Sequence, residues 1–168
     1  MRVERRDPAG DPGLAARLLE IQHAAYAIEA RLIGDDRIPP LSEDVDALVG
    51  AGLDWLVATG EGGVLGALAL TEDGGGIGID RLVVDPAVAR RGVGRALVAA
   101  VLADADGRPV TVSTGRGNTP ARRLYARAGF RETGEREVLP GLWVVDLVTD
   151  RSPAGPHREP GSGTGSPG

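Results

Sequence analysis

The chain contains no cysteine and no lysine among its 168 residues. The absence of cysteine excludes disulfides, thiolate nucleophiles and zinc sites built on thiolates. The absence of lysine excludes a Schiff-base mechanism and a Walker-type phosphate loop, because both require the lysine amine. Aromatic residues are also scarce, and the segment from Arg81 to Arg131 holds only Tyr125 and Phe130. We therefore expect no nucleic-acid partner for this acidic protein.

Long apolar segments are absent too. No run approaches the roughly 20 apolar residues of a membrane span, and the N-terminal sequence MRVERRDPAGDPG lacks the apolar centre of a signal peptide. We expect a cytoplasmic protein that needs no membrane and no metal ion. The exclusive use of arginine as the basic residue, together with 26 glycines, is typical of a bacterial genome rich in G and C.

The charge is distributed unevenly along the chain. The net charge is −5, yet the segment from Arg81 to Arg131 contains ten arginines and only three acidic residues. A basic segment inside an acidic protein indicates an anionic ligand at that segment. A solvated helix surface would explain the same count.

Hydrophobic periodicity and turn residues predict one α/β domain over residues 1–150, in the order β-α-α-β-β-β-α-β-α-β-β. Asp11 and Ser42 are expected to cap the first two helices, Gly34 to end the first, and Gly129 to end the fourth in a left-handed conformation. Residues 151–168 are rich in Gly, Pro and Ser and are expected to form a disordered tail. The strands are expected near residues 2–6, 54–59, 64–71, 77–84, 109–114, 130–137 and 142–149, and the third and fourth helices near residues 92–105 and 118–128.

The sequence LVVDPAVARRGVGRALVAAVL combines a buried strand, a Pro, two glycines and an amphipathic helix. A helix N-terminus presents unpaired N–H groups, and Gly92 and Gly94 allow a phosphate to approach the main chain. Arg90, Arg91 and Arg95 add positive charge around this point. The arrangement suits a pyrophosphate, although a G-x-G sequence often marks only a tight turn.

A dinucleotide fingerprint is excluded at this loop. The third glycine of G-x-G-x-x-G is replaced by Leu97, and no acidic residue lies about 20 positions further on to bind a ribose. The loop is therefore a phosphate cradle of another type.

The same loop resembles motif A of the GNAT acetyltransferase superfamily, in which a strand, a [QR]-x-x-G-x-[GA] loop and a helix follow one another. Downstream, GNTPARRLYARAGF is similar to motif B of that family, with Asn118 and Tyr125 seven residues apart on a helix that ends in Gly-Phe. One position departs from motif A, because Ala89 stands where Gln or Arg is usual. The resemblance implies a single α/β (α+β) domain with a mixed, mostly antiparallel sheet, and acetyl-CoA as co-substrate.

The resemblance also implies roles for individual residues. The main chain of Leu82, Val83 and Val84 would pair with the pantetheine arm, and an N–H near Val84 would stabilise the oxyanion of the thioester. Asn118 would help to hold the cofactor, or it is a helix N-cap ahead of Pro120, and both roles can hold at once. The pyrophosphate would be held by Arg90, Arg91, Gly92, Val93, Gly94 and Arg95.

Proton transfer is assigned to two further residues. Tyr125 would protonate the leaving thiolate, or else it is a packed tyrosine. Asp80 is the leading candidate for the general base, since strand alternation places Asp80, Leu82 and Val84 on one face. Glu29, Glu72 and His23 are weaker candidates.

The predicted function is transfer of an acetyl group to a primary amine within a ternary complex. The alternative is a non-catalytic acyl-CoA sensor of the same fold. The partner would be a small-molecule or peptide amine, and a homodimer is left open. Residues 29–46 contain six acidic residues and two arginines, which favours a cationic amine or is simply a solvated acidic face.

Overall fold

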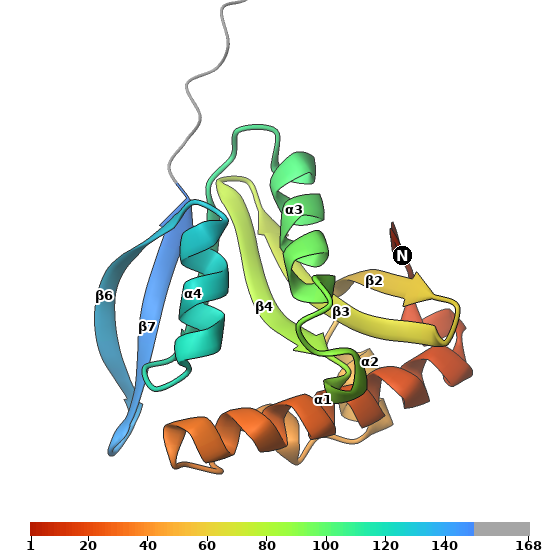
Figure 1. The fold of residues 1–168 in the computed structure, drawn as a ribbon, viewed down its shortest axis with the longest axis horizontal. Helices are drawn as coiled ribbons and strands as arrows, with labels where there is room; N and C mark the ends of the chain where they lie inside the picture. The colour runs from red at the N-terminus through yellow and green to blue at the C-terminus, as the bar shows by residue number, and fades with distance from the viewer. Residues whose placement is uncertain (150–168) are drawn as a thin grey trace, which may run out of the picture.

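Seven strands form one mixed sheet in the computed structural model, which describes residues 1–149 (Figure 1). Their spatial order is β1-β2-β3-β4-β5-β7-β6, and every neighbouring pair is antiparallel except β4 and β5. The predicted sheet is thus confirmed, while the expected tail at 151–168 and the domain end at residue 150 lie outside the described residues. The strands are β1 (Arg2–Arg5), β2 (Asp54–Gly60), β3 (Gly63–Asp73), β4 (Gly76–Val84), β5 (Val110–Gly115), β6 (Phe130–Leu139) and β7 (Leu142–Thr149).

Four α-helices and three short 3-10 turns complete the described part of the chain, in the predicted order of strands and helices. Across residues 1–149, no helix combines the length and the apolar character that crossing a bilayer requires. The helices are α1 (Pro12–Ile33), α2 (Val45–Gly50), α3 (Val93–Ala105) and α4 (Thr119–Arg127), and the turns are η1 (Pro8–Gly10), η2 (Pro39–Leu41) and η3 (Pro86–Val88).

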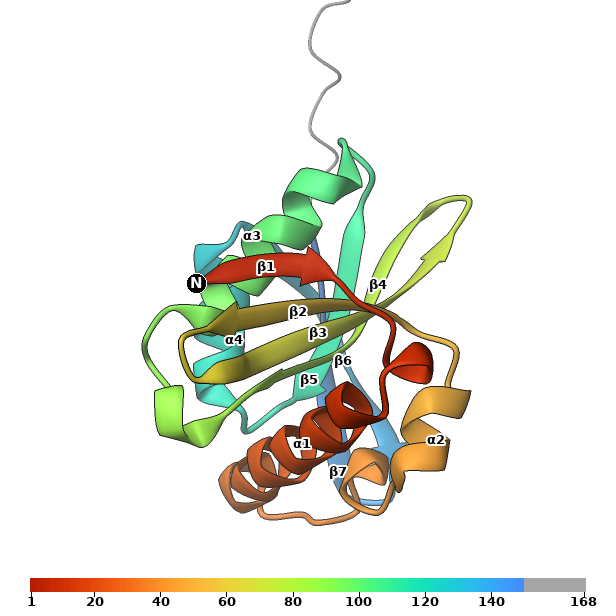
Figure 2. The same ribbon diagram turned by 90° about the vertical axis from the view of Figure 1, so that its right-hand side faces the viewer.

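The core has two layers, and alternate side chains of β2 and β3 point into one layer or the other. Leu56 and Leu68 pack in the layer that contains the buried face of α3, whereas Val57 and Ala67 pack against α1 and α2. Successive side chains of a strand point to opposite faces, so one sheet supports helices on both sides. Figure 2 shows α3 on one side of β2 and β3, and α1 and α2 on the other.

Most of the predicted helix boundaries are confirmed. Asp11 accepts a hydrogen bond from the N–H of Leu14, and both Gly34 and Gly129 have positive φ angles at the ends of α1 and α4. The expected cap of the second helix is wrong.

The second helix begins two residues later than Ser42. Asp44 caps α2 through Oδ1, which accepts from the N–H of Ala47 at 2.8 Å. The Ser42 hydroxyl instead donates to the carbonyl of Pro39 and closes η2.

Candidate active site

The two parallel strands at the centre of the sheet, β4 and β5, separate after a short ladder. Their pairing ends at Ile79 and Val112. Beyond that point β4 remains paired only with β3, so one edge of residues 80–84 carries main-chain N–H and C=O groups without a strand partner. Figure 1 shows β4 and β7 diverging toward the end of the sheet that α1 crosses.

A β-bulge interrupts β4 where it leaves β5. Residues 69–70 of β3 pair with Arg81 and Ile79, which leaves Asp80 without a partner. A bulge adds one residue and reverses the alternation that follows it. Ile79 and Leu82 consequently pack against the same core layer, and the uninterrupted alternation expected from the sequence is wrong at Asp80.

A cavity of about 210 Å³ lies between the diverging strands. The ends of β4 and β5, the start of α4, the second half of α1 and the β6–β7 hairpin form its walls. Four predicted site residues come together here: Asp80, Leu82, Asn118 and Tyr125. Val83, by contrast, is buried in the core layer of α1, and residues 90–95 lie at the start of α3.

The N-terminus of α3 differs from those of the other three α-helices in the described chain. Those helices follow Asp11, Asp44 and Asn118, each of which accepts a hydrogen bond from a main-chain N–H of the first turn. α3 follows Gly92, which has a φ of 82° and no side chain with which to cap the helix. The first N–H groups of α3 are therefore available to an anion, and the positive end of the helix dipole favours one.

The two glycines of this loop serve different purposes. A Cβ atom on Gly92 would meet no atom within 4 Å, so the need for glycine there is the left-handed backbone. A Cβ atom on Gly94 would lie 3.3 Å from Leu124 and 3.7 Å from Val84. Gly94 therefore allows α3 to pack closely against α4 and β4, in addition to the approach of a phosphate expected from the sequence.

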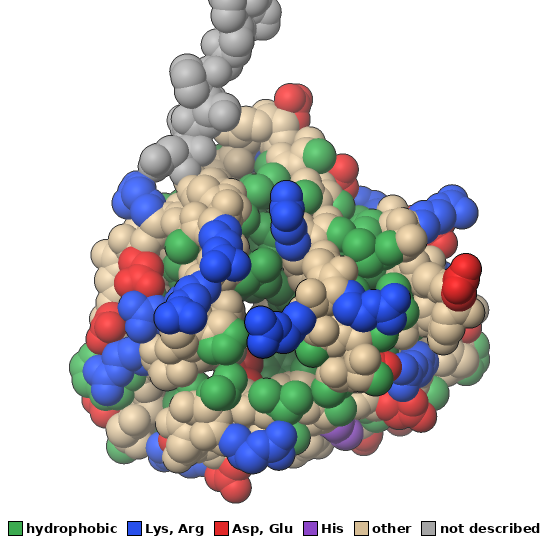
Figure 3. All heavy atoms as spheres, in the orientation of Figure 1, with side chains coloured by type: hydrophobic (Ala, Val, Ile, Leu, Met, Phe, Trp, Pro, Cys, Tyr) green, Lys and Arg blue, Asp and Glu red, His purple; other side chains and the backbone are tan. Residues whose placement is uncertain are grey.

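Positive charge surrounds this helix start. Arg90, Arg91 and Arg95 are exposed, and none of them forms an ion pair within residues 1–149. Arg90 adopts a φ of 66°, which is uncommon outside glycine and often accompanies a functional loop. Figure 3 shows several basic side chains around a hollow on the face that carries α3 and α4. Ala89, the departure from motif A, is exposed and offers no polar group.

Tyr125 is buried at the wall of the cavity. Its side chain is 4% exposed and makes an edge-to-face contact with Phe130, with ring centroids 5.3 Å apart. Burial, reinforced by the negative charge of Glu29, raises the pKa of Tyr125 far above its usual value. The hydroxyl is therefore protonated throughout the neutral range and available as a proton donor.

Asn118 joins α4 to α1. Its Oδ1 atom accepts from the N–H of Ala121 at 3.2 Å, which confirms the predicted N-cap. Its side chain also lies beside Glu29 and lowers the pKa of that carboxyl group. A contact between Asn118 and the cofactor stays a prediction.

Glu29, one of the weaker candidates for the general base, belongs to α1, as does Tyr26. Both line the cavity together with Ile33. Burial raises the pKa of Glu29 and outweighs the opposing hydrogen bonds from Asn118 and Gly115. The signal available in the sequence was the helical spacing of residues 26, 29 and 33, which places them on one face of α1.

Arg81, which the sequence offers only as one member of the basic segment, also lines the cavity. It follows the bulge, is buried, and donates from Nε to Asp80 at 2.7 Å and from Nη1 to Glu43 at 2.5 Å and Gln22 at 3.0 Å. Gln22 in turn donates to the carbonyl of Pro40 at 3.0 Å. This network connects α1, β4 and the segment before α2, and it holds Asp80 at the cavity wall.

The two remaining base candidates, Glu72 and His23, lie elsewhere. Glu72 pairs with Arg5 at 3.2 Å and with Arg108 at 3.0 Å. His23 contacts the carbonyl of Glu43 through Nε2 at 2.8 Å. Neither lines the cavity. Within residues 1–149, no group of three or more His, Asp or Glu side chains is arranged to hold a metal ion.

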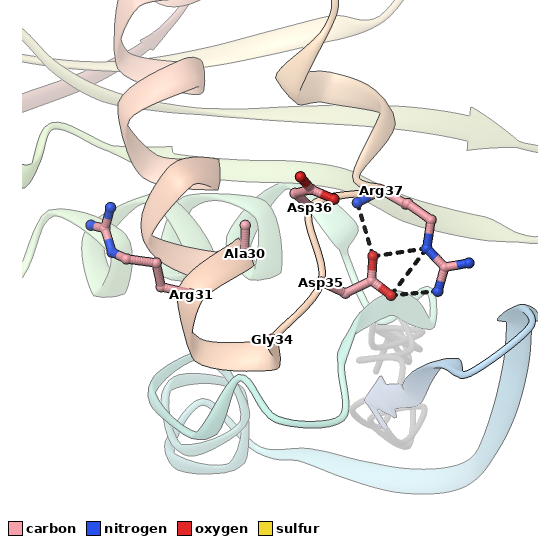
Figure 4. A pocket seen from close by; sticks show the side chains of 6 residues that line it. All are labelled: Ala30, Arg31, Gly34, Asp35, Asp36 and Arg37. Atoms are coloured by element: carbon pink, nitrogen blue, oxygen red, sulfur yellow. Dashed lines mark hydrogen bonds and ion pairs between the residues drawn. The ribbon is translucent and has the colours of Figure 1, made fainter.

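Most of the acidic side chains of the segment 29–46 lie away from the cavity. Glu29 is the only one of these carboxylates there. Glu43 binds Arg81, Asp44 caps α2, and hydrogen bonds from Arg37 lower the pKa of Asp35 to about 2. Figure 4 shows that Asp35–Arg37 pair at a separate open hollow beside the end of α1. The interpretation as a solvated face thus fits the exposed Asp36, Asp44 and Asp46, whereas Glu43 is half-buried in its ion pair.

Comparisons with known proteins agree with this architecture. Residues 51–132 match the family model described as an acetyltransferase (GNAT) domain. The mycothiol acetyltransferase of Clavibacter michiganensis subsp. michiganensis is 39% identical over 137 residues, which are 80% of this chain and 42% of that protein. The UPF0157 protein YqkA of Bacillus subtilis is 33% identical over 130 residues, or 77% of this chain and 38% of that protein. The chain thus spans about two fifths of the length of these curated relatives.

Solved structures show the same fold at low sequence identity. The ribosomal-protein-S18-alanine N-acetyltransferase from Escherichia coli has a TM-score of 0.71 and 18% identity, with 94% of this chain and 98% of that one covered. The acetyltransferase YncA from Salmonella typhimurium, solved with acetyl-CoA, has a TM-score of 0.66 and 19% identity, with 96% and 98% covered. The two sequence motifs, the match of residues 51–132 to the family model and the similarity to the mycothiol acetyltransferase together show the family. The chain belongs to the GNAT acetyltransferase superfamily.

Proposed function

We propose that the protein transfers an acetyl group from acetyl-CoA directly to a primary amine. The observation that carries the proposal is the unpaired edge of β4, which leads into the uncapped N-terminus of α3. An exposed strand edge suits an extended, amide-containing arm, and an open helix N-terminus suits a pyrophosphate. The absence of cysteine leaves no thiol for an acetylated enzyme intermediate, so transfer within a ternary complex is the simplest route.

The residues present fit acetyl-CoA as the donor substrate. The main chain of Leu82, Val83 and Val84 would bind the pantetheine arm, and an N–H near Val84 would stabilise negative charge on the thioester oxygen. The main chain of Gly92, Val93 and Gly94, with the side chains of Arg90, Arg91 and Arg95, would bind the pyrophosphate. Asn118, at the cavity wall, would complete the binding of the donor.

Tyr125 would donate a proton to the departing thiolate. Its position at the cavity supports this role, and its raised pKa keeps the hydroxyl protonated at neutral pH. The amine must also lose protons, and two carboxylates line the cavity, those of Asp80 and Glu29. Asp80 is the strand residue expected from the sequence to act as base.

The acceptor is proposed only as a class, a primary amine of a small molecule or a peptide. The relatives motivate the choice of candidates. One is a mycothiol acetyltransferase, and another is the peptidyl-lysine N-acetyltransferase YjaB of Salmonella typhimurium, which is 34% identical over 84 residues. The walls of the cavity include the apolar residues Ile38, Pro39, Val138 and Leu142, so amines attached to an apolar group belong in any panel.

The test is an assay of CoA release from acetyl-CoA with phenethylamine, a lysine peptide, an alanine-terminated peptide, spermidine and kanamycin as acceptors. Tyr125→Phe should lower kcat by about 100-fold with an unchanged dissociation constant for acetyl-CoA, because the lost hydroxyl acts in proton transfer and not in binding of the donor. Unchanged turnover would contradict the role of Tyr125. Tight acetyl-CoA binding without transfer to any of these amines would favour the sensor alternative.

A further inference from the structure

Glu29 occupies an unusual place for a carboxylate. It lies in the second half of α1, which crosses the open end of the sheet (Figure 1), and it lines the cavity with Tyr26, Asn118 and Tyr125. Its Oε1 atom is 3.4 Å from the position of a Cβ atom built on Gly115. The carboxylate therefore lies against the end of β5, beside the gap between β4 and β5.

Two neutral donor groups lie beside this carboxylate. The side chain of Asn118 and the main-chain N–H of Gly115 both favour its charged form and lower its pKa against the effect of burial. Oδ1 of Asn118 is already used to cap α4, so its NH₂ group is free to donate to the carboxylate. Neither partner is a cation, and a carboxylate bound only by neutral donors can still accept a proton.

We propose that Glu29 is the general base that accepts the proton of the acceptor amine. This inference rests on the proposed acetyl transfer and deepens it, because it places the acceptor nitrogen between α1 and the end of β5. Glu29 then faces the same cavity as Tyr125, so the proton acceptor and the proton donor come from different helices.

Asp80 is less suited to this task. Its Oδ2 atom accepts from Nε of Arg81 at 2.7 Å, and its side chain is 38% exposed. The guanidinium of Arg81 therefore already occupies an oxygen with which Asp80 would have to accept the amine proton. Glu29 has no ion-pair partner within residues 1–149.

The electrostatics of the cavity agree with the geometry. Burial raises the pKa of Glu29, and a carboxylate whose pKa moves toward neutrality is a stronger base at physiological pH. Burial and the charge of Glu29 in turn raise the pKa values of Tyr26 and Tyr125. The titratable and charged groups that face Glu29 across the cavity are Tyr26 of its own helix, Arg37 of the following loop, Asp80 and Arg81 of β4, and Tyr125 of α4.

The protons balance in this scheme. The acceptor enters as an ammonium ion and gives one proton to Glu29, which releases it to solvent. The amine nitrogen then forms a bond to the acetyl carbon, and the C–S bond breaks with its electron pair on sulfur. Tyr125 protonates that sulfur and recovers a proton from the nitrogen. Each turnover yields the amide, CoA and one free proton.

The test compares Glu29→Gln with Glu29→Ala, using the panel amine that the wild-type protein acetylates fastest. Gln can still accept from Asn118 and Gly115, whereas Ala cannot. If Glu29 is the base, both variants should lose at least about 100-fold in kcat while the dissociation constant for acetyl-CoA is unchanged. Glu20→Gln is the matched control, because Glu20 lies on the same helix with its side chain 68% exposed and should leave kcat unchanged.

The pH profile gives a second readout. Without its base, Glu29→Gln depends on amine that is already neutral in solution, so kcat/KM should rise tenfold per pH unit from pH 6 to 9. The wild-type kcat should level off above the pKa of Glu29. A Gln variant with wild-type kcat and an inactive Ala variant would show that Glu29 only supports Gly115 and Asn118, and would overturn the proposal.

Other outcomes are equally decisive. If the pH profile of Glu29→Gln matched that of the wild type while Asp80→Asn lost most of its kcat, the role would move to Asp80 and the proposal would be overturned. Failure of the wild-type protein to acetylate any amine in the panel would overturn the proposed function and the role of Glu29 together. Wild-type transfer with a fully active Glu29→Gln would overturn the role of Glu29 alone.

Discussion

Replacing Arg81 with methionine should destabilise the protein strongly at neutral pH and much less at acidic pH. The Arg81 side chain is 7% exposed, and that of its partner Glu43 is 20% exposed. Methionine fills much of the aliphatic volume but provides neither charge nor hydrogen-bond donors. The substitution therefore removes the cation from Glu43 and Asp80 and leaves Oε1 of Gln22 without its donor.

The expected magnitude follows from the burial of the pair. Removing one partner of a buried ion pair typically costs about 3–5 kcal/mol, because the other charge stays buried without compensation. Glu43 keeps a hydrogen bond from Nε2 of Gln22 at 2.8 Å and some contact with solvent. We therefore expect the lower end of that range, about 3 kcal/mol in the free energy of unfolding at pH 7.

The pH dependence follows from the pKa of Glu43. Burial alone would raise this pKa, but hydrogen bonds from Arg81 and Gln22 outweigh burial and hold it below the usual 4.5. A carboxyl group with a lowered pKa in the folded state stabilises the fold above its unfolded pKa, and this contribution is lost as the pH falls through the folded pKa. The difference between wild type and Arg81→Met should thus be full at pH 7 and shrink below pH 4.5.

Urea denaturation at pH 7 and at acidic pH measures the loss of unfolding free energy and its dependence on pH. The comparison requires that the m-value is the same in the variant and the wild type. Arg2→Met is the control, since the Arg2 side chain is 78% exposed in its pair with Glu4 and should contribute less than about 1 kcal/mol. Adding Glu43→Gln to Arg81→Met should restore part of the loss. A difference below about 1 kcal/mol at pH 7, or the same difference at both pH values, would refute the reasoning.

Two further predictions concern the backbone around the site. Gly66→Ala should cost about 1–3 kcal/mol of stability and weaken acetyl-CoA binding, because its Cβ would lie 2.7 Å from the carbonyl oxygen of Val83 on β4; calorimetry showing wild-type stability and affinity would contradict this close contact. Asp44→Ala should cost about 1 kcal/mol through loss of the α2 cap, whereas Ser42→Ala should cost less. Thermal unfolding of the two variants shows which loses more stability, and a larger loss in Ser42→Ala would favour Ser42 as the cap, as expected from the sequence.

The sequence by itself determined the elements, their order and the place of the phosphate loop. These features depend on neighbouring residues: the spacing of Leu14, Leu18 and Ile21 along α1, the cap at Asp11, and the left-handed glycine that ends α4. The open N-terminus of α3 also depends on a neighbouring residue, because Gly92 provides no side chain to cap it. Local conformational preferences and hydrophobic periodicity act within a few residues, so they can be recognised in the chain alone.

The tertiary structure decided the chemistry of the cavity. The bulge at Asp80 arises from the register between β3 and β4, and the burial of Glu29 arises from the packing of α1 against the end of β5. Six acidic residues looked alike in the segment 29–46, yet only Glu29 lines the cavity, while Glu43 is neutralised by Arg81 from a distant strand. Desolvation and charge pairing depend on groups far apart in the chain, so no local pattern could separate a candidate base from a solvated carboxylate.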